Sequence, residues 1–209
     1  MDAIRAGLVM EALRALYPEA KPELNFRNPY ETLVATILSA QCTDKRVNLV
    51  TARLFPLVPD AFDMAKLTPE ELEPMIRECG LYYNKAKNII AASRALVERY
   101  NGEVPRTRAE LMALPGVGQK TAGVVLLAAF GDDQIPVDTH VFRVSRRIGL
   151  ADANTPEKVE SQLKALLDRD IWSLGHHLII WHGRRCCHAR KPECDRCPLN
   201  DGLCEKNME

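Results

Sequence analysis

The stretch 114–122, which reads LPGVGQKTA, constrains the fold more than any other part of this chain. A helical pattern that begins at Thr107 runs into this stretch, and an apolar helical run over 124–130 leaves it. Pro115 cannot continue the first helix, because proline lacks a backbone N–H and clashes with the preceding turn. The stretch therefore predicts two helices joined by a tight hairpin.

Two glycines, Gly116 and Gly118, lie in the predicted hairpin. Because neither carries a side chain, another backbone or a ligand can come very close to them. The N–H groups at the start of the second helix and the helix dipole both favour an anion such as phosphate. A tight turn between two helices with no ligand explains the same residues, so the hairpin alone leaves both interpretations open.

Lys120 falls in the first turn of the second predicted helix. A cation is unfavourable there, and the positive end of the helix dipole favours a neutral amine, as partial desolvation would. A neutral lysine is a nucleophile that attacks carbonyl-like carbons and sugar C1′. The alternative is a solvated lysine that contacts phosphate, and its position does not decide between the two roles.

Asp138, within the sequence VDTH, follows the second helix after a short turn and fits the N-cap position of the next helix. An N-cap carboxylate normally accepts only backbone hydrogen bonds. If it faced back towards Lys120, it could instead stabilise positive charge at a sugar C1′ or move protons. The sequence does not give the distance that separates these two roles.

Four cysteines near the C-terminus follow the spacing C-x6-C-x2-C-x6-C, with Cys186 directly before the first. Four thiolates so close together can hold zinc or an iron–sulfur cluster, and the spacing alone leaves both metals open. Arg190 and Lys191 lie between the first two ligands, and a basic loop fixed at both ends suits phosphate contact, with ordinary solvated charge as the alternative. The expected ligands are Cys187, Cys194, Cys197 and Cys204.

Composition and periodicity indicate an all-α globular protein. Hydrophobic residues make up 46% of the 209, which is enough for a core, and 28 basic residues balance 28 acidic ones. About nine or ten short helices are expected, one of them capped by Asn28 and Glu31, and no period-2 strand is evident. No apolar run reaches 18 residues and no cleavable signal pattern opens the chain, so we expect a cytoplasmic protein without a membrane segment.

Three motifs in this order, LPGVGQKTA, VDTHVFRVSRRIGL and the cysteine pattern, resemble the endonuclease III family. The resemblance extends to LSAQCTD (38–44) and GLYYNKAKNI (80–89) and so spans almost the whole chain. It implies an all-α fold of two helical lobes with a DNA-binding cleft and a helix–hairpin–helix motif. A six-helix lobe (22–131) would contain the hairpin, and a second lobe (132–209, with 1–21 packed onto it) would hold a [4Fe-4S] cluster loop.

The same resemblance implies a bifunctional DNA glycosylase and AP lyase of base excision repair. Such an enzyme removes oxidised pyrimidines from duplex DNA and cuts the strand 3′ to the abasic site by β-elimination. Lys120 would form the Schiff base, Asp138 would be the catalytic carboxylate, and the four cysteines would bind the cluster. The partner would be double-stranded DNA with damaged pyrimidines or abasic sites, bound by a monomer that is nucleoid-associated if bacterial. DNA contacts are expected from Gln41, Leu81, Leu114, Gly116, Val117, Gly118, Gln119, His140, Arg143, Arg190 and Lys191.

Two departures from the family pattern and two alternatives accompany this interpretation. The last cysteine spacing is x6 where x5 is common in the family, and Gly123 stands where the family often has asparagine. A sister adenine glycosylase shares the hairpin, the aspartate and the cluster, but it usually lacks the hairpin lysine. A DNA-binding module with a structural metal would have no need of Lys120 and Asp138 together.

Overall fold

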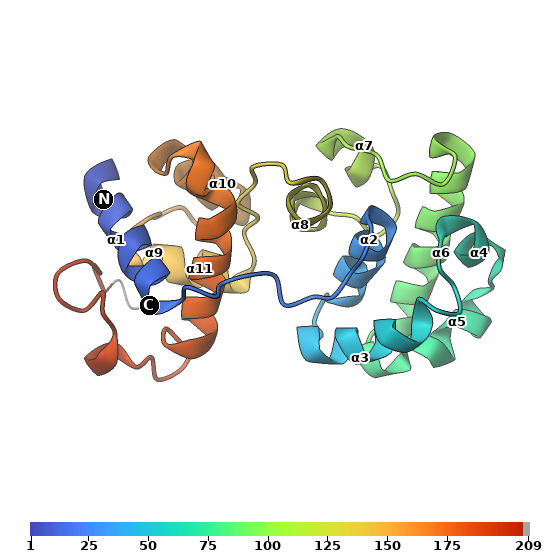
Figure 1. The fold of residues 1–209 in the computed structure, drawn as a ribbon, viewed down its shortest axis with the longest axis horizontal. Helices are drawn as coiled ribbons and strands as arrows, with labels where there is room; N and C mark the ends of the chain where they lie inside the picture. The colour runs from blue at the N-terminus through green and yellow to red at the C-terminus, as the bar shows by residue number, and fades with distance from the viewer. Residues whose placement is uncertain (207–209) are drawn as a thin grey trace. The chain divides into compact units, whose positions relative to one another are not determined.

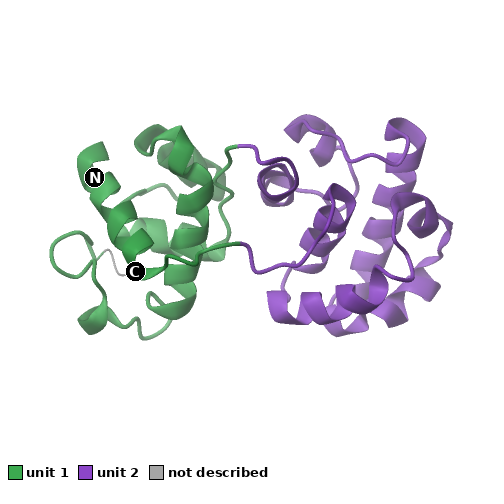
Figure 2. Ribbon diagram, in the orientation of Figure 1, with its two compact units in different colours: residues 1–21, 133–209 green, residues 22–132 purple. Residues whose placement is uncertain are grey.

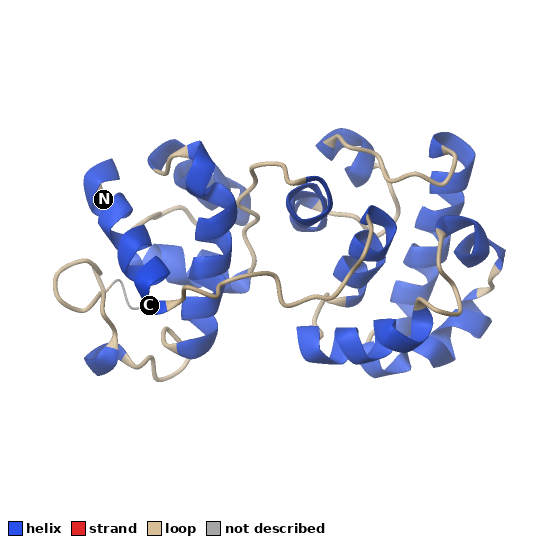
Figure 3. Cartoon of the chain, viewed as in Figure 1, coloured by secondary structure: helices blue, strands red, loops and turns tan. Residues whose placement is uncertain are grey.

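The computed structural model describes residues 1–206, which form helices and loops without a strand (Figures 1 and 3). The predicted all-α fold is confirmed. No helix within these residues is long and apolar enough to span a bilayer. The elements are α1 (Ala3–Leu16), α2 (Pro29–Leu38), α3 (Asp44–Leu54), α4 (Ala61–Lys66), α5 (Pro69–Ile76), η1 (Arg77–Cys79), α6 (Tyr82–Tyr100), α7 (Arg108–Met112), α8 (Gln119–Phe130), α9 (Thr139–Ile148), α10 (Pro156–Leu166), η2 (Arg169–Ile171), α11 (Trp172–Arg185) and η3 (Cys194–Arg196).

The ends of these helices follow the capping residues of the sequence. The side chains of Asn28, Thr107 and Asp138 each accept a hydrogen bond from a backbone N–H in the first turn of the helix that follows. Gly131 ends α8 in the left-handed conformation, at φ 69°. Helix α4 was not anticipated, because its six residues are too few for a helical period to stand out, although Asp60 caps it.

The chain divides into two compact units (Figure 2). Unit 1 comprises 1–21 and 133–209, and unit 2 comprises 22–132. Each unit has its own hydrophobic core, and the buried residues of the two cores do not mix. The N-terminal helix therefore contributes to the same core as the C-terminal part of the chain, because Ala6, Val9 and Leu13 are completely buried there.

Helix α6 is the central element of unit 2. It contacts α2, α4 and α5, while α2 also packs against α8, and α7 against α8. The 19 residues of α6 bury one face, on which Ala86, Ile89 and Leu96 are fully enclosed. The helices on both sides of the hairpin are thus tied to a core that α6 organises.

In unit 1, α11 packs against α9 and α1. The approach of α11 to α9 is close at Gly183, where an added Cβ would lie 3.0 Å from both His140 Nδ1 and Val144 Cγ2. Only glycine allows this contact without a shift of its neighbours. Helix α9 is therefore held directly against the end of α11 that leads into the cysteines.

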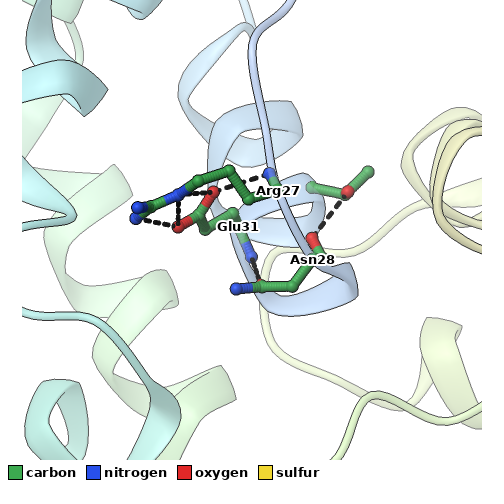
Figure 4. A network of polar contacts seen from close by, with 4 residues as sticks. Arg27, Asn28 and Glu31 are labelled. Atoms are coloured by element: carbon green, nitrogen blue, oxygen red, sulfur yellow. Dashed lines mark hydrogen bonds and ion pairs between the residues drawn. The ribbon is translucent and has the colours of Figure 1, made fainter.

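The N-terminus of α2 contains a buried carboxylate network (Figure 4). Asn28 Oδ1 accepts from the Glu31 N–H at 2.8 Å, as the capping pattern predicts. The Glu31 carboxylate reaches back one residue further than in a standard capping box, and it accepts from the Arg27 N–H at 2.7 Å and from the Arg27 guanidinium. Since Glu31 is only 1% exposed, these bonds compensate the burial of its charge.

We predict that Asn28→Ala lowers the free energy of unfolding by about 1 kcal/mol, because it removes the side-chain acceptor at the start of α2. Urea unfolding followed by circular dichroism measures the change. Asn28→Ser retains an oxygen acceptor and is the matched control. An equal loss in both variants would show that the cap bond is not the cause.

Candidate functional site

The hairpin joins α7 to α8 over residues 113–118. Gly116 adopts φ 78°, and a Cβ there would lie 2.7 Å from Asn88 Cβ on α6, so both its conformation and its packing require glycine. The side chains of Leu114 and Val117 are buried in the core of unit 2. Those two residues can therefore offer only their backbone groups to a ligand.

Gly118 caps α8 without a side chain, and no described atom lies within 4 Å of the place where its Cβ would be. Packing within the unit thus does not require this glycine, and the N-terminus of α8 is open to an outside group. Gln119 and Lys120 follow in the first turn, both exposed, and Gln119 Oε1 accepts a bond of 3.0 Å from Arg108. Lys120 is therefore not desolvated by the other residues of unit 2.

Asp138 is the N-cap of α9 in unit 1. Its Oδ1 accepts from the N–H groups of His140 at 2.9 Å and Val141 at 2.8 Å. The side chain is half-buried, and one carboxylate oxygen carries both cap bonds. Asp138 is therefore an N-cap, as its position in the sequence suggested, and the cap bonds fix the orientation of its carboxylate.

Arg143 ties α9 to the end of α11. Its guanidinium donates to the carbonyl oxygens of Gly183, at 3.0 Å, and Cys187, at 3.1 Å, and to His140 Nδ1 at 3.2 Å. Because arginine only donates, His140 Nδ1 is the acceptor in this pair. Burial lowers the pKa of His140, while the charge of Asp138 opposes that shift. Much of the donor capacity of Arg143 is thus used within unit 1.

Arg147, one turn further along α9, holds the cysteine loop. Its guanidinium donates to the carbonyl oxygens of His188 at 2.6 Å and Ala189 at 3.0 Å. The four-residue spacing from Arg143 places both arginines on one face of α9 and was the available signal. The loop residues that follow, Arg190 and Lys191, are exposed, and Lys191 adopts φ 53°.

All four expected cysteine ligands line one cavity of about 100 Å³ in unit 1. Apolar groups from Ile148, Pro192 and Leu199 also line it. The remaining lining residues are Arg147, His182, Cys186, Glu193 and Lys206. Four thiols around a small apolar cavity fit an iron–sulfur cluster, which takes thiolate ligands in a setting that restricts solvent. The six residues between Cys197 and Cys204 form turns, and Gly202 among them adopts φ 93°. Cys204 still reaches the cavity and accepts a bond of 3.3 Å from the Lys206 N–H.

A fifth cysteine complicates the ligand set. Ligand atoms of His182, Cys186 and Cys197 lie within 4.8 Å of one another, a geometry that could itself hold a metal. The Cys186 thiol, however, donates to the carbonyl oxygen of Glu193, and burial raises its pKa to about 12. His182 shares a bond of 3.2 Å with the Tyr17 hydroxyl and lies 3.6 Å from Cys197 Sγ. Burial lowers the pKa of His182 to about 4, so this histidine is neutral at physiological pH.

Gln41 and Leu81, both in unit 2, adopt left-handed backbone conformations at φ 53° and 48°. Such values are uncommon for residues other than glycine and cost energy that the surrounding structure must supply. Gln41 follows the end of α2, and Leu81 is the N-cap residue of α6. Both side chains are exposed, Leu81 to 52%.

Comparisons with known proteins define the class of this site. Residues 34–169 match the family model of the HhH-GPD superfamily base excision DNA repair proteins. Residues 187–204 match the iron-sulfur binding domain of endonuclease III, a range that begins and ends on the first and last expected ligands. The hairpin and the cysteine loop thus belong to a helix–hairpin–helix DNA repair enzyme with an iron–sulfur cluster.

The particular family follows from relatives that match over nearly the full length. Endonuclease III of Synechocystis sp. is 48% identical over 93% of this chain and 90% of its own, and that of Escherichia coli K12 is 47% identical over 94% and 93%. A trapped endonuclease III–DNA covalent intermediate superposes with a TM-score of 0.94 at 45% identity, covering 99% of this chain and 97% of the other. The chain therefore belongs to the endonuclease III family, as the motifs indicated.

Family membership brings two conclusions. The protein is a base excision repair DNA glycosylase with AP-lyase activity, and its cofactor is a [4Fe-4S] cluster. A thermostable thymine-DNA glycosylase of 24% identity, with a TM-score of 0.86, shows that the same fold occurs in more distant glycosylases.

We predict that Asp138→Ala lowers the free energy of unfolding by about 1 kcal/mol, since it removes the acceptor of two N–H groups at the start of α9. Asp138→Asn retains an oxygen in the same place and should unfold close to the wild type in urea. If the asparagine variant were as unstable as the alanine variant, the negative charge rather than the cap oxygen would be responsible.

Proposed function

We propose that this enzyme removes oxidised pyrimidines from duplex DNA and then cuts the strand 3′ to the abasic site through a Schiff base on Lys120. The observation that supports this most strongly is the position of Lys120. It is exposed in the first turn of α8, directly after the hairpin. The N-cap residue of α8 is Gly118, so no side chain occupies the cap position. An anion bound at that helix end would bring a sugar–phosphate backbone to the amine.

In the proposed reaction, the neutral Lys120 amine attacks C1′ as the glycosidic bond breaks, and the base leaves with the bonding electrons and a proton. The attached nitrogen then loses a proton, which passes to O4′ as the C1′–O4′ bond breaks, so the opened sugar carries a hydroxyl group at C4′ and an imine at C1′. The imine makes the C2′ proton acidic, so its removal expels the 3′ phosphate by β-elimination. Water then hydrolyses the imine and frees Lys120.

We assign to Asp138 the stabilisation of positive charge at C1′ and the movement of protons to and from the sugar. The proposal requires that Lys120 and Asp138 act on the same nucleotide. One carboxylate oxygen of Asp138 holds the two cap bonds, and the cap fixes the direction of the other. A carboxylate held in this way needs little reorganisation as charge develops.

DNA binding is proposed to rest mainly on phosphate contacts. The exposed residues Gly116 and Gly118 of the hairpin suit this role through their backbone N–H groups. Gln119, Arg190 and Lys191 are also exposed and suit it through their side chains. Gln41 and Leu81 are proposed to enter the duplex beside the extruded nucleotide. Leu114 and Val117 would contribute to DNA binding through their backbone groups alone. His140 and Arg143 would contribute mainly by shaping the surface near Asp138.

The proposed ligands of the [4Fe-4S] cluster are Cys187, Cys194, Cys197 and Cys204. All four line one cavity, and the family match runs from the first to the last of them. When bound, the cluster cross-links four thiolates and so fixes the loop that carries Arg190 and Lys191. The donation from Cys186 to Glu193 supports leaving Cys186 outside this set.

The lesion class is tested by a single-turnover panel of duplexes, each with one defined damaged base. Oxidised pyrimidines should be removed much faster than oxidised or alkylated purines. Preferential removal of adenine from mispairs would instead favour the sister glycosylase.

For the cofactor, we predict about four irons per chain and a yellow-brown protein. Cys187→Ser should lose most of the iron and unfold more easily, because a ligand is missing. Cys186→Ser is the matched control one residue away and should retain its iron. Iron analysis and the visible absorption spectrum measure the iron content of both variants. Iron loss in Cys186→Ser but not in Cys187→Ser would make Cys186 the ligand in place of Cys187.

For the chemistry, we predict that borohydride traps wild-type enzyme on abasic-site DNA as a covalent adduct. Lys120→Ala should lose the adduct and strand cleavage yet still bind DNA, since the hairpin backbone remains. Lys87→Ala, in the same unit, should be trapped normally. Asp138→Asn should slow base removal while it retains trapping on a preformed abasic site. Undiminished trapping in Lys120→Ala would place the nucleophile elsewhere.

A further inference from the structure

A buried lysine joins the two turns that carry Gln41 and Leu81. Lys85, in the first turn of α6, is only 4% exposed. Its Nζ donates to the carbonyl oxygen of Leu38 at 2.8 Å and to that of Cys79 at 2.8 Å. Leu38 is the last residue of α2, three positions before Gln41, and Cys79 ends η1, two positions before Leu81.

The two turns lie together on unit 2, since one ammonium group bonds a carbonyl beside each of them. Burial and the neighbouring Cys42 thiol also raise the pKa of the Cys79 thiol. Carbonyl groups at helix ends lack partners in their own helix, and the C-terminal end of α2 favours a cation. A single ammonium group that bonds both carbonyls fixes the separation of the two chain segments. It does so immediately beside both left-handed residues, whose strained conformations must be maintained by the surrounding structure.

Stability alone does not account for a charged group at this place. Burial of an ammonium carries a desolvation cost, which is reflected in the lowered pKa of Lys85, and an apolar side chain of similar length would avoid that cost. The lysine is the group on α6 that reaches both turns at once through directional bonds. Such bonds suit the positioning of two segments better than they suit the filling of a core.

We propose that Lys85 is a positioning residue that holds the Gln41 turn and the Leu81 turn at a fixed separation, so that both enter the duplex together. This inference rests on the proposed role of Gln41 and Leu81 beside the extruded nucleotide. Prior organisation of the two turns removes the cost of ordering them during binding. Loss of the bridge should therefore slow nucleotide extrusion and leave the chemistry at Lys120 unchanged.

The test compares Lys85→Met with wild type on two substrates. In single turnover, removal of a base-paired oxidised pyrimidine from duplex DNA should slow by about tenfold to a hundredfold, the range that a small misplacement of functional groups produces. Borohydride trapping on a single-stranded oligonucleotide with one abasic site needs no entry into a duplex, so its rate should not change. Lys85→Arg retains donors for both carbonyls and should recover duplex activity. Lys87→Met, an exposed lysine on the same helix, is the control for loss of charge.

A fluorescent readout separates this inference from the proposed function. 2-Aminopurine placed opposite a tetrahydrofuran abasic analogue brightens when protein side chains disrupt the stack. Gln41→Ala and Leu81→Ala should weaken the signal, and Lys85→Met should weaken it similarly. If the first two variants leave the signal unchanged, the role of the two turns is wrong. If they weaken it and Lys85→Met does not, the positioning role of Lys85 is wrong.

Equal loss of duplex activity and single-strand trapping in Lys85→Met would indicate a purely structural lysine and would also overturn the proposal. Should the methionine variant fail to fold, Lys85→Gln removes the charge with a smaller change in polarity and carries the same comparison.

Discussion

The close contact of Gly116 with α6 is the constraint on which unit 2 depends. A Cβ at this position would overlap Asn88, so the hairpin can rest on α6 only through a bare backbone. The same helix begins at Leu81 and carries Lys85, which bonds the end of α2. Helix α6 thus positions the hairpin, the Leu81 turn and the Gln41 turn, because each of them contacts or adjoins this helix.

Helix α9 has the corresponding role in unit 1. Asp138 caps its N-terminus, while Arg143 and Arg147 bind carbonyl groups at the end of α11 and in the cysteine loop. The carboxylate proposed for catalysis and the loop that carries the cluster are therefore oriented by one helix. Loss of the loop would therefore remove carbonyl partners of Arg143 and Arg147 on α9.

Local signals in the sequence predicted much of this arrangement. Asn28, Thr107 and Asp138 were recognised as N-caps because their side chains compete for backbone N–H groups only a few residues away. The role of Arg147 was missed, since nothing in the sequence shows that its partners are carbonyl groups 41 and 42 positions later. The bridge formed by Lys85 was missed for the same reason, as the Leu38 carbonyl lies 47 positions away.

The sequence by itself determined most of the helices, the hairpin, the family and the spacing of the cysteines, because each depends on residue types at short and fixed spacings. Only the tertiary structure decided that Lys120 is open to solvent, that Leu114 and Val117 are buried, and that Cys186 bonds a carbonyl beside the proposed ligands. It also showed that Lys85 is enclosed between two turns. The physical reason is that exposure and the partner of a charged group depend on contacts between segments distant in the sequence, which residue spacing along the chain does not specify.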